Sequence, residues 1–533
     1  MNTSVYKNLL NAYKKCNIIK IKKEFMVKRM NYEIALESLK KINNEMGYIR
    51  ALAMFFMWDQ YVGLPVEGTA YRVQIQNYIS SRSSELINAE ETKRLAEYFS
   101  GIDLKNIENV IDRAIIRSFL YKYKYTVNVP LEKMKKLTKL QTESQGNWMK
   151  ARAENNYSIF EPSLKAVFEL KMEMASEIDK TKTPFEIMVD ESDEELNLEE
   201  VNREFDKIKY AVKELMIKIK SSNVTVDDSF FDKEFDQDEL FDFVKFVCEK
   251  TGYDINRGAY GKAPHPFTIM VGPKDARITV NLSSYKGAVT AAVHEAGHAM
   301  YGYRGNDEVN DSNLWGGVPG GFHEAQSRFY ENIIGKSKAF WECFYPEAQK
   351  RFKQFEGVSL DEYYRAINKS QASLKRILAD EISYNLHPII RFELEQELMS
   401  GKIEFKDLAN AWNDKYFEYL GMRPENDNDG ILQDIHWSVG MFGYFQSYTL
   451  GNIYGGQIRN ALIKAVPNVY EEIAKGNFEP LNSWMTENVH QYGNTYTAGE
   501  LIRRITGEGL NADYFIQYLN EKYNDIYNLN ANN

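Results

Sequence analysis

The 533-residue sequence predicts a mostly α-helical protein. Apolar residues recur at spacings of two to four over long stretches, as they do on the buried face of a helix. Only 13 prolines interrupt the chain, which favours long helices. No segment repeats with a period of about 20–50 residues, so a solenoid of stacked units is not expected. These observations indicate a mainly α fold with room for one small β element.

The composition is that of an ordinary globular protein, with 44% hydrophobic and 27% charged residues. A formal net charge of -10 argues against nucleic acid as an obligate partner. No stretch approaches the roughly 18 apolar residues of a membrane span, so no membrane partner is expected. Cys16, Cys248 and Cys343 are far apart and odd in number. They predict free thiols in a reducing compartment rather than a disulfide framework.

Residues 1–29 form a lysine-rich segment in which Glu24 is the only acid. Lys20, Lys22 and Lys23 interrupt its best apolar stretch, so a secretory signal is not predicted. We interpret residues 1–29 as a basic N-terminal extension, or as the product of a start codon upstream of Met26 or Met30. Residues 30–533 are expected to form a single domain.

Three long stretches carry the helical pattern most clearly. Residues 32–56 and residues 201–219 place apolar side chains on one helical face. Residues 363–398 are also periodic and long, and Pro388 marks a kink or boundary there. Looser segments rich in Gly, Asn, Asp or Pro are expected at residues 227–238, 304–321 and 422–430.

One stretch predicts β structure. Residues 267–271 and 277–282 favour strands and flank the turn sequence GPKD, which indicates a small hairpin. The hairpin lies shortly before the string HEAGH at residues 294–298. Zinc peptidases commonly use an edge strand at this place to hold the substrate backbone.

The HEAGH string is the strongest indication of chemistry in the chain. On a helix, His294 and His298 project from one face one turn apart, so both imidazoles can bind one metal ion. Glu295 points toward the open side of that metal, where it can take a proton from water. The pattern predicts a zinc hydrolase.

A catalytic zinc ion needs three protein ligands and one open position. The metzincin pattern is excluded because Tyr301 and Arg304 occupy the places of its glycine and third histidine. The remaining common solution is a glutamate from a second helix, and Glu324 in HEAQSRFYEN is the candidate. Arg328 follows four residues later, where thermolysin-like enzymes carry an aspartate, so that pattern fails as well.

These strings resemble the carboxypeptidase Taq family of zinc metallocarboxypeptidases, whose members carry HExxH and then a second HE-S/A-Q-S-R segment. The resemblance implies that His294, His298 and Glu324 are the zinc ligands and that Glu295 is the general base. It extends over about residues 32–517. Further matching strings are WDQ at residues 58–60 with Pro65, Gly68 and Arg72, HPF at 265–267, DARIT at 275–279, KRILAD at 375–380 and GILQDIHW at 430–437.

Two positions depart from the family pattern: Lys375 replaces an isoleucine, and Gln446 replaces a proline in GYFQSY. Both lie near positions expected to line the substrate cleft, so they put details of specificity in doubt. The reaction itself is not affected, because neither residue is an expected zinc ligand.

The resemblance also implies residues that stabilise the oxyanion of the transition state. Related helical gluzincins use a histidine and a tyrosine about a dozen positions later, and His436 and Tyr448 have that offset. Tyr444 is the second candidate. Because the chain contains 35 tyrosines, most of them are expected to be packing residues.

A carboxypeptidase must recognise a free carboxylate, and arginine suits this through bidentate hydrogen bonding. The family analogy points to Arg376 on a helix that lines the cleft, with Arg277 as a second candidate at the closed end. The alternative for Arg376 is a structural ion pair with Asp380 at i+4. Candidate partners that orient the ligand histidines are Asp275, Gln433 and Asp434. The WDQ segment is interpreted as structural, at the lip of the cleft.

The resemblance implies a helical zincin-like fold with a deep cleft between two helical halves and the small hairpin beside the active site. Residues 30–533 would be one catalytic domain. The expected enzyme is a cytoplasmic homodimer that binds Zn²⁺, with Co²⁺ as a possible substitute. It would release single residues from peptides with a free C-terminus, with broad tolerance and with proline disfavoured.

Two alternatives stay open. A helical zinc oligoendopeptidase would share the ligands but would also cleave peptides amidated at the C-terminus. A catalytically silent zincin scaffold would bind metal without releasing amino acids. Metal analysis combined with a peptide-release assay separates that scaffold from either enzyme.

Overall fold

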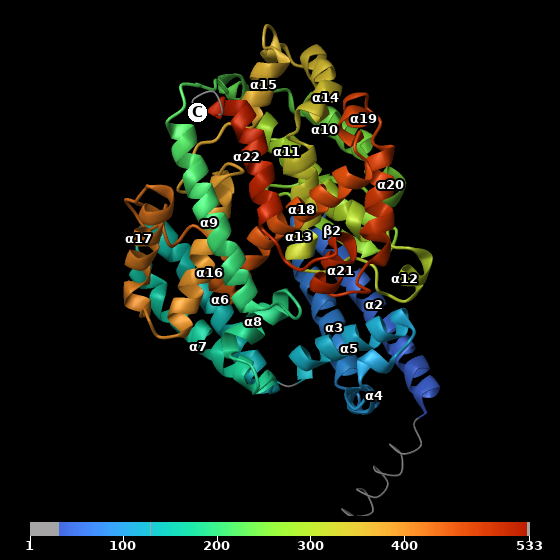
Figure 1. Ribbon diagram of the computed structural model, residues 1–533. Helices are drawn as coiled ribbons and strands as arrows, with labels where there is room; N and C mark the ends of the chain where they lie inside the picture. The colour runs from blue at the N-terminus through green and yellow to red at the C-terminus, as the bar shows by residue number, and fades with distance from the viewer. Residues whose placement is uncertain (1–30, 128, 530–533) are drawn as a thin grey trace, which may run out of the picture. The chain divides into compact units, whose positions relative to one another are not determined.

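A computed structural model describes residues 31–127 and 129–529 (Figure 1). The basic extension predicted at residues 1–29 lies outside the described residues. The described chain is mostly helical, which confirms the predicted mainly α class. Before the small sheet the α-helices are α2 (Tyr32–Val62), α3 (Thr69–Ile87), α4 (Glu90–Ser100), α5 (Val110–Val127), α6 (Leu131–Glu154), α7 (Glu161–Ile178), α8 (Pro184–Ser192), α9 (Leu198–Lys220) and α10 (Gln237–Thr251).

After the sheet the α-helices are α11 (Tyr285–Tyr303), α12 (Asp307–Asp311), α13 (Gly321–Arg328), α14 (Lys338–Arg351), α15 (Leu360–Ile367), α16 (Leu386–Met399), α17 (Leu408–Leu420), α18 (Gln446–Ala465), α19 (Val469–Ala474), α20 (Glu479–Asn488), α21 (Ala498–Thr506) and α22 (Asp513–Tyr527). The helices predicted at residues 32–56 and 201–219 are confirmed as parts of α2 and α9.

The described chain separates into two compact units. The smaller unit comprises residues 31–56 and 65–127, and buried Leu39, Leu95, Phe99 and Ile116 contribute to its core. The larger unit comprises residues 57–64 and 129–529. All the predicted site residues belong to the larger unit.

The sheet has three strands, β1 (Tyr260–Lys262), β2 (Thr268–Gly272) and β3 (Asp275–Val280), in the order β1-β3-β2. Strands β2 and β3 pair antiparallel, with Thr268 opposite Ile278, which confirms the predicted hairpin. Strand β1 pairs parallel with β3 and was not predicted. Both β2 and β3 contact α11, and β2 is an edge strand of the described sheet.

Helix α11 is buried along most of its length. It begins at the N-cap Ser284, whose hydroxyl oxygen accepts a hydrogen bond from the Gly287 amide at 3.3 Å. Small side chains let its neighbours come close, and α10, α13 and β3 all contact it. Its buried alanines are Ala288, Ala292, Ala296 and Ala299.

The stretch 363–398 differs from the single long helix that its periodicity predicts. Helix α15 ends at Ile367 and α16 begins at Leu386, with an irregular segment between them. The carboxylate of Asp380 accepts hydrogen bonds from the amides of Gln371, Ile382 and Ser383, each at 2.8 Å. A short acidic side chain bonded to nearby amides competes with helix formation.

Proline 388 does mark a boundary, as predicted, because it lies in the first turn of α16. Backbone N–H groups in the first turn of a helix have no intrahelical acceptor, so a proline there costs no hydrogen bond.

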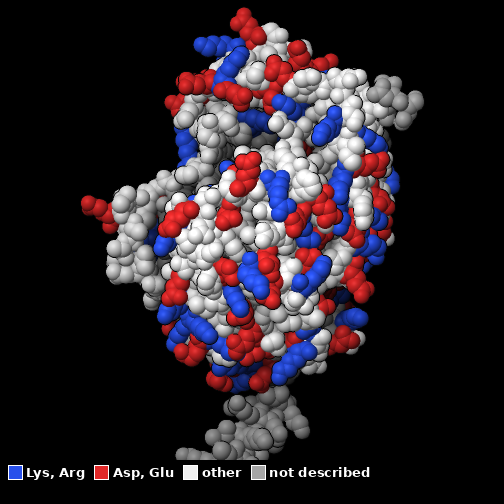
Figure 2. All heavy atoms as spheres, turned by 90° about the vertical axis from the view of Figure 1, so that its left-hand side faces the viewer, with Lys and Arg blue, Asp and Glu red and all other residues white. Residues whose placement is uncertain are grey.

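Acidic and basic side chains are interspersed over the face in Figure 2. Within residues 31–127 and 129–529, none of the helices has the length and apolar character that crossing a bilayer requires.

Candidate metal centre

The two histidines of HEAGH lie on one face of α11, with ring centroids 4.9 Å apart. Helix α13 brings Glu324 to them. Its Oε2 lies 3.6 Å from Nε2 of His298 and 4.0 Å from Nε2 of His294. Tetrahedral bonds of about 2.0–2.1 Å place neighbouring ligand atoms about 3.4 Å apart, so the three donors can hold one divalent cation. Glu324 is the partner that the sequence predicts for the two histidines.

Two glycines allow the helices at this point to approach one another. A Cβ atom at Gly297, inside the HEAGH string, would lie 2.8 Å from the carbonyl oxygen of Gln326 in α13. A Cβ atom at Gly451 in α18 would lie 2.7 Å from Cγ of Glu324. Larger residues would push α13 away from α11 or α18. The glycines therefore set the distance between the glutamate and the histidines.

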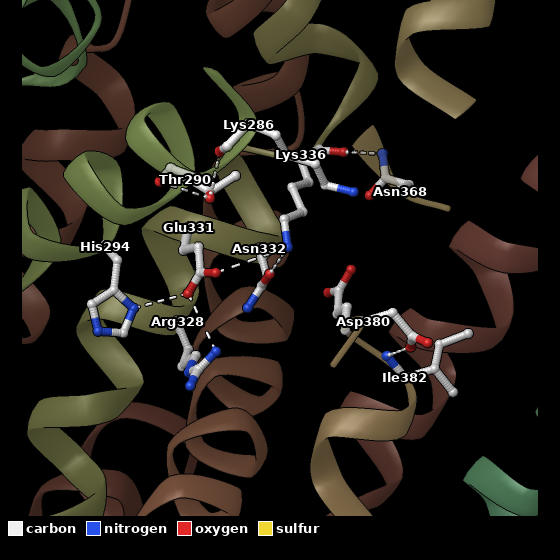
Figure 3. Close-up of polar contacts among 12 residues, drawn as sticks. Lys286, Thr290, His294, Arg328, Glu331, Asn332, Lys336, Asn368, Asp380 and Ile382 are labelled. Atoms are coloured by element: carbon white, nitrogen blue, oxygen red, sulfur yellow. Dashed lines mark hydrogen bonds and ion pairs between the residues drawn. The ribbon is translucent and has the colours of Figure 1, made fainter. Parts of the chain in front are cut away.

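The far nitrogen of His294 is bound to a carboxylate. Its Nδ1 lies 2.8 Å from Oε2 of Glu331, which lies in a π-helical turn after α13 (Phe329–Ile334; Figure 3). Burial opposes ionisation of Glu331, but Arg328 and His294 hold its pKa well below the ordinary value. The ionised carboxylate accepts a hydrogen bond from Nδ1–H, so the lone pair of His294 is on Nε2, the nitrogen facing Glu324.

His298 is oriented through a second histidine. Its Nδ1 lies 2.6 Å from Nδ1 of His323, and Nε2 of His323 lies 3.0 Å from the carbonyl oxygen of Gly316. A carbonyl only accepts, so Nε2 of His323 donates and its Nδ1 accepts from His298. Burial lowers the pKa of His323 to about 4, which keeps that ring neutral at pH 7. The lone pair of His298 is therefore also on Nε2.

Glu324, the third donor, is held through its other carboxylate oxygen, Oε1. Nε of Arg328 donates to Oε1 of Glu324 at 2.8 Å, which leaves Oε2 facing the histidines. Each of the three ligands is held by a hydrogen bond to its other nitrogen or oxygen. Two imidazole nitrogens and one carboxylate oxygen form a donor set that suits zinc.

The residues expected to orient the ligand histidines are not the ones that do so. Asp275 pairs with Arg277, Gln433 accepts a hydrogen bond from the Arg376 amide, and Asp434 pairs with two arginines. That prediction is wrong, because Glu331 and His323 fill the role.

Both missed residues are in the HEAQSRFYEN string. Glu331 follows Glu324 by seven residues, about two helical turns, and His323 is adjacent to Glu324. The same spacing argument that links His294 to His298 could have found Glu331.

Glu295 lies beside the edge strand of the sheet. Its side chain is 8% exposed, and the Thr268 hydroxyl on β2 is 2.6 Å from its Oε2 and 2.9 Å from its carbonyl oxygen. Burial raises the pKa of Glu295. The predicted base and the predicted substrate-holding strand are therefore in direct contact.

The predicted oxyanion residues lie together. Nε2 of His436 is 3.2 Å from the hydroxyl of Tyr448, and the Tyr444 ring is 5.5 Å from the Tyr448 ring. Tyr448 is in the first turn of α18, the helix that packs Gly451 against Glu324. Burial lowers the pKa of His436 to about 4. Of the two tyrosines, Tyr448 is the one within hydrogen-bonding distance of His436.

Arg376 is in a 3-10 turn (Arg376–Leu378), not on a helix as predicted. Its Nε and Nη2 donate to Oδ1 of Asp434 at 3.1 and 2.9 Å, and its Nη1 donates to the Tyr384 hydroxyl at 3.2 Å. The alternative pairing with Asp380 is therefore wrong. Asp434 also binds the fully buried Arg391 at 2.6 Å. Arg376 is 10% exposed, and part of its guanidinium is already engaged.

Arg277 is on β3 and is also paired. Its Nε and Nη2 donate to the carboxylate of Asp275 at 2.8 and 2.7 Å. The guanidinium lies 5.9 Å from the ring centre of Trp58. Trp58 is buried and packs against Phe267, which supports a structural role for the WDQ segment.

Asp193 joins the two helices that carry Glu324 and Tyr448, and the sequence gives no signal for it. One carboxylate oxygen accepts from the Gly321 amide at the start of α13 at 2.6 Å. The other accepts from Ser447 at 2.6 Å and from Gln446 at 3.0 Å. Gln446, which departs from the family pattern, is thus used in a buried hydrogen bond.

Comparison with known proteins agrees with this geometry. Residues 38–523 match the carboxypeptidase Taq (M32) metallopeptidase family. The chain is 32% identical to carboxypeptidase 1 of Bacillus subtilis (strain 168) over 494 residues, 92% of this chain and 97% of that protein. It is 32% identical to thermostable carboxypeptidase 1 of Pyrococcus furiosus over 470 residues, 87% and 94% of the two chains. The crystal structure of the M32 carboxypeptidase from Deinococcus radiodurans R1 superposes with a TM-score of 0.88 at 32% identity, covering 93% and 99%.

Proposed function

The chain belongs to the carboxypeptidase Taq (M32) metallopeptidase family, and on that premise we propose that it uses zinc to release single amino acids from the C-terminus of peptides. The family identity makes it a metallocarboxypeptidase, a peptide hydrolase that uses a divalent metal. The observation that supports zinc is the donor set of His294, His298 and Glu324, whose ligand atoms lie within 4.8 Å of one another. Cobalt can substitute, because mixed nitrogen and oxygen sites accept both ions.

Zinc, when bound, supplies a Lewis acid that polarises the scissile carbonyl and acidifies water. Glu295 takes a proton from the attacking water on its carboxylate and passes it to the nitrogen of the leaving amino acid. Its contact with the Thr268 hydroxyl, at 2.6 Å, holds the carboxyl beside the edge strand β2. An extended peptide paired with that edge would present its carbonyl next to Glu295.

Tyr448 donates a hydrogen bond to the oxyanion, with His436 beside it as a second donor or as the group that orients the hydroxyl. Tyr444 is assigned the lesser role, because Tyr448 is the one that contacts His436. Arg376 binds the free carboxylate of the substrate with the part of its guanidinium that Asp434 does not use. Arg277 is assigned, by the family likeness, to substrate binding at the closed end of the cleft.

The finer assignments rest on the family likeness. The enzyme tolerates many terminal side chains and disfavours proline. Residues 30–533 act as one catalytic domain with the cleft between two helical halves. The protein is a cytoplasmic homodimer whose partners are peptides with a free C-terminus, with neither nucleic acid nor membrane among them.

Mass spectrometry of a defined peptide mixture, incubated with the zinc-loaded protein, tests the proposal. Each peptide is supplied with a free and with an amidated C-terminus. We expect stepwise loss of one residue from the free peptides and no change in their amidated twins. Internal cleavage, or cleavage of the amidated twins, would instead favour the oligoendopeptidase. Zinc binding without any release would identify a silent scaffold.

A further inference from the structure

A cavity of about 560 Å³ lies next to the metal centre, and Glu331 forms part of its wall. Figure 3 shows Glu331 between His294 and the lysines of the cavity. The wall is built by the start of α11, by the turn after α13 and by the irregular segment between α15 and α16. Its charged residues are three lysines and five acids, namely Lys286, Lys336 and Lys369, and Asp228, Asp232, Glu331, Asp380 and Glu381.

The cavity lies beside the face of α11 that carries the two histidines. Lys286, Thr290, His294 and His298 follow one another at intervals of four residues. At about 1.5 Å per residue, Lys286 is about 12 Å from His294 along the helix axis. A ligand in the cavity would therefore be a near neighbour of a substrate at the metal.

Among the described residues, the ammonium group of Lys286 has no carboxylate within ion-pair distance. Within the part of the chain that the structure describes, it has neither a hydrogen bond nor an ion pair, and the Phe231 ring centre is 6.0 Å away. Burial, and then the nearby charge of Lys336, lowers the pKa of Lys286 to about 8, against the opposing effect of the more distant carboxylates of Asp228 and Asp380. The group is still mostly protonated at pH 7. Lys286 is partly buried, and a bound anion would stabilise its ammonium group where water only partly solvates it.

Lys336 adds a second ammonium group. Its Nζ donates to Oδ1 of Asn332 at 2.6 Å and lies 3.9 Å from Oε1 of Glu331 (Figure 3). That carboxylate is already bound by His294 and Arg328. Since an ammonium has three N–H donors, Lys336 keeps donors for a ligand.

The other acidic groups of the wall are engaged elsewhere. Asp228 pairs with Lys369 at 2.7 Å, and Glu381 pairs with the buried Lys522 at 2.7 Å. The carboxylate of Asp380 accepts hydrogen bonds from three backbone amides of the segment between α15 and α16. Asp232 is exposed to solvent. Among the lysines of the described wall, this leaves Lys286 and Lys336 as the two whose ammonium groups have no hydrogen bond to a carboxylate.

We propose that this cavity binds an oxyanion, a carboxylate or phosphate group, between Lys286 and Lys336. The anion has two possible sources that share this chemistry. It is either a free small molecule or the side-chain carboxylate of an acidic C-terminal residue on a peptide held at the metal. The second source rests on the proposed function, and the first does not.

Isothermal titration of inorganic phosphate into the zinc-loaded protein tests the site. Wild type and the exposed-lysine control Lys218→Met on α9 should bind phosphate saturably with equal affinity. Lys286→Met should bind at least tenfold more weakly, and Lys286→Arg should restore binding, which also shows that the position tolerates substitution. Absence of saturable binding to wild type, or an unchanged affinity in Lys286→Met, overturns the proposal. Phosphate bound at the metal itself would give that second result.

Kinetics with three N-blocked peptides that end in Glu, Gln or Leu distinguish the sources. If the terminal side chain occupies the site, the Glu-to-Gln ratio of kcat/KM exceeds one and falls about tenfold in Lys286→Met, while the Leu peptide is unaffected. If a free anion occupies it, the ratio is the same in both proteins and only phosphate binding is lost. Failure to cleave all three peptides, with phosphate binding intact, contradicts the proposed function and supports the anion site.

Discussion

At the metal centre, Glu331 and His323 bind the far nitrogens of His294 and His298, whereas around Asp434 the charged groups bind one another. In the first arrangement, Nε2 of His294, Nε2 of His298 and Oε2 of Glu324 are left with lone pairs that can bind one metal ion. In the second, the single carboxylate of Asp434 pairs with both Arg376 and Arg391 within the fold. A substrate carboxylate must therefore share Arg376 with Asp434, while a metal ion at the first site meets no such competitor.

The largest effect is expected from Glu295→Gln, which keeps the shape of the base but removes its proton affinity. We expect kcat to fall by about 10²–10⁴-fold, because general-base catalysis contributes on that scale. Zinc content and the melting temperature should stay close to wild type. Steady-state release of a C-terminal leucine, with metal analysis of the same sample, checks this. A variant that retains most of its activity would remove Glu295 from the mechanism.

Tyr448→Phe should have the next largest effect. Loss of one oxyanion donor lowers kcat by about 10²–10³-fold, with little change in KM because the ground-state peptide does not use it. Tyr444→Phe is the matched control, since it removes a hydroxyl from the neighbouring ring and should cost far less. If the two variants exchange these outcomes, Tyr444 is the donor and the contact between His436 and Tyr448 is structural.

Glu331→Gln tests whether the carboxylate that binds Nδ1 of His294 contributes to metal binding. An amide can still contact His294, but it lacks the negative charge that favours the Nδ1–H tautomer. We expect zinc affinity to fall about 10–100-fold, as for other outer partners of metal ligands. Competition with a chromophoric chelator measures this without reference to activity. Glu132→Gln, at an exposed position on α6, is the control, and an equal loss there would contradict the role of Glu331.

Arg376→Ala should have the smallest effect of the four and should appear in KM. We expect a rise in KM of about tenfold, equivalent to about 1.4 kcal/mol of binding, for peptides with a free carboxylate, with kcat nearly preserved. Stability should fall only modestly, because Arg391 still pairs with Asp434. Unchanged kinetics together with a lower melting temperature would mean that Arg376 serves the fold alone.

The parts of the site that the sequence could predict are those set by spacing along a helix. His294 and His298 lie one turn apart, and any α-helix brings such residues together. The hairpin before α11 was predictable for a similar reason, because two short strands and a turn are adjacent in the chain.

Two other partners that were missed or misassigned, Asp193 and Asp434, are far in sequence from the groups they bind. Asp434 meets Arg376 across 58 residues, and Asp193 meets Gly321 across 128. Periodicity contains no information about such pairs. It also concealed the break between α15 and α16, where the hydrogen bonds of Asp380 override an apolar pattern that suits a helix.

From the amino-acid order alone came the helical class, the two imidazoles one turn apart and the acid beside them, since local geometry is sufficient for each. Only the packed chain decided that Glu324 approaches those imidazoles to 3.6 and 4.0 Å, which groups hold their far nitrogens, and which arginines share Asp434. Those choices depend on how closely α11, α13 and α18 approach, and that distance is set by side-chain volume at Gly297 and Gly451.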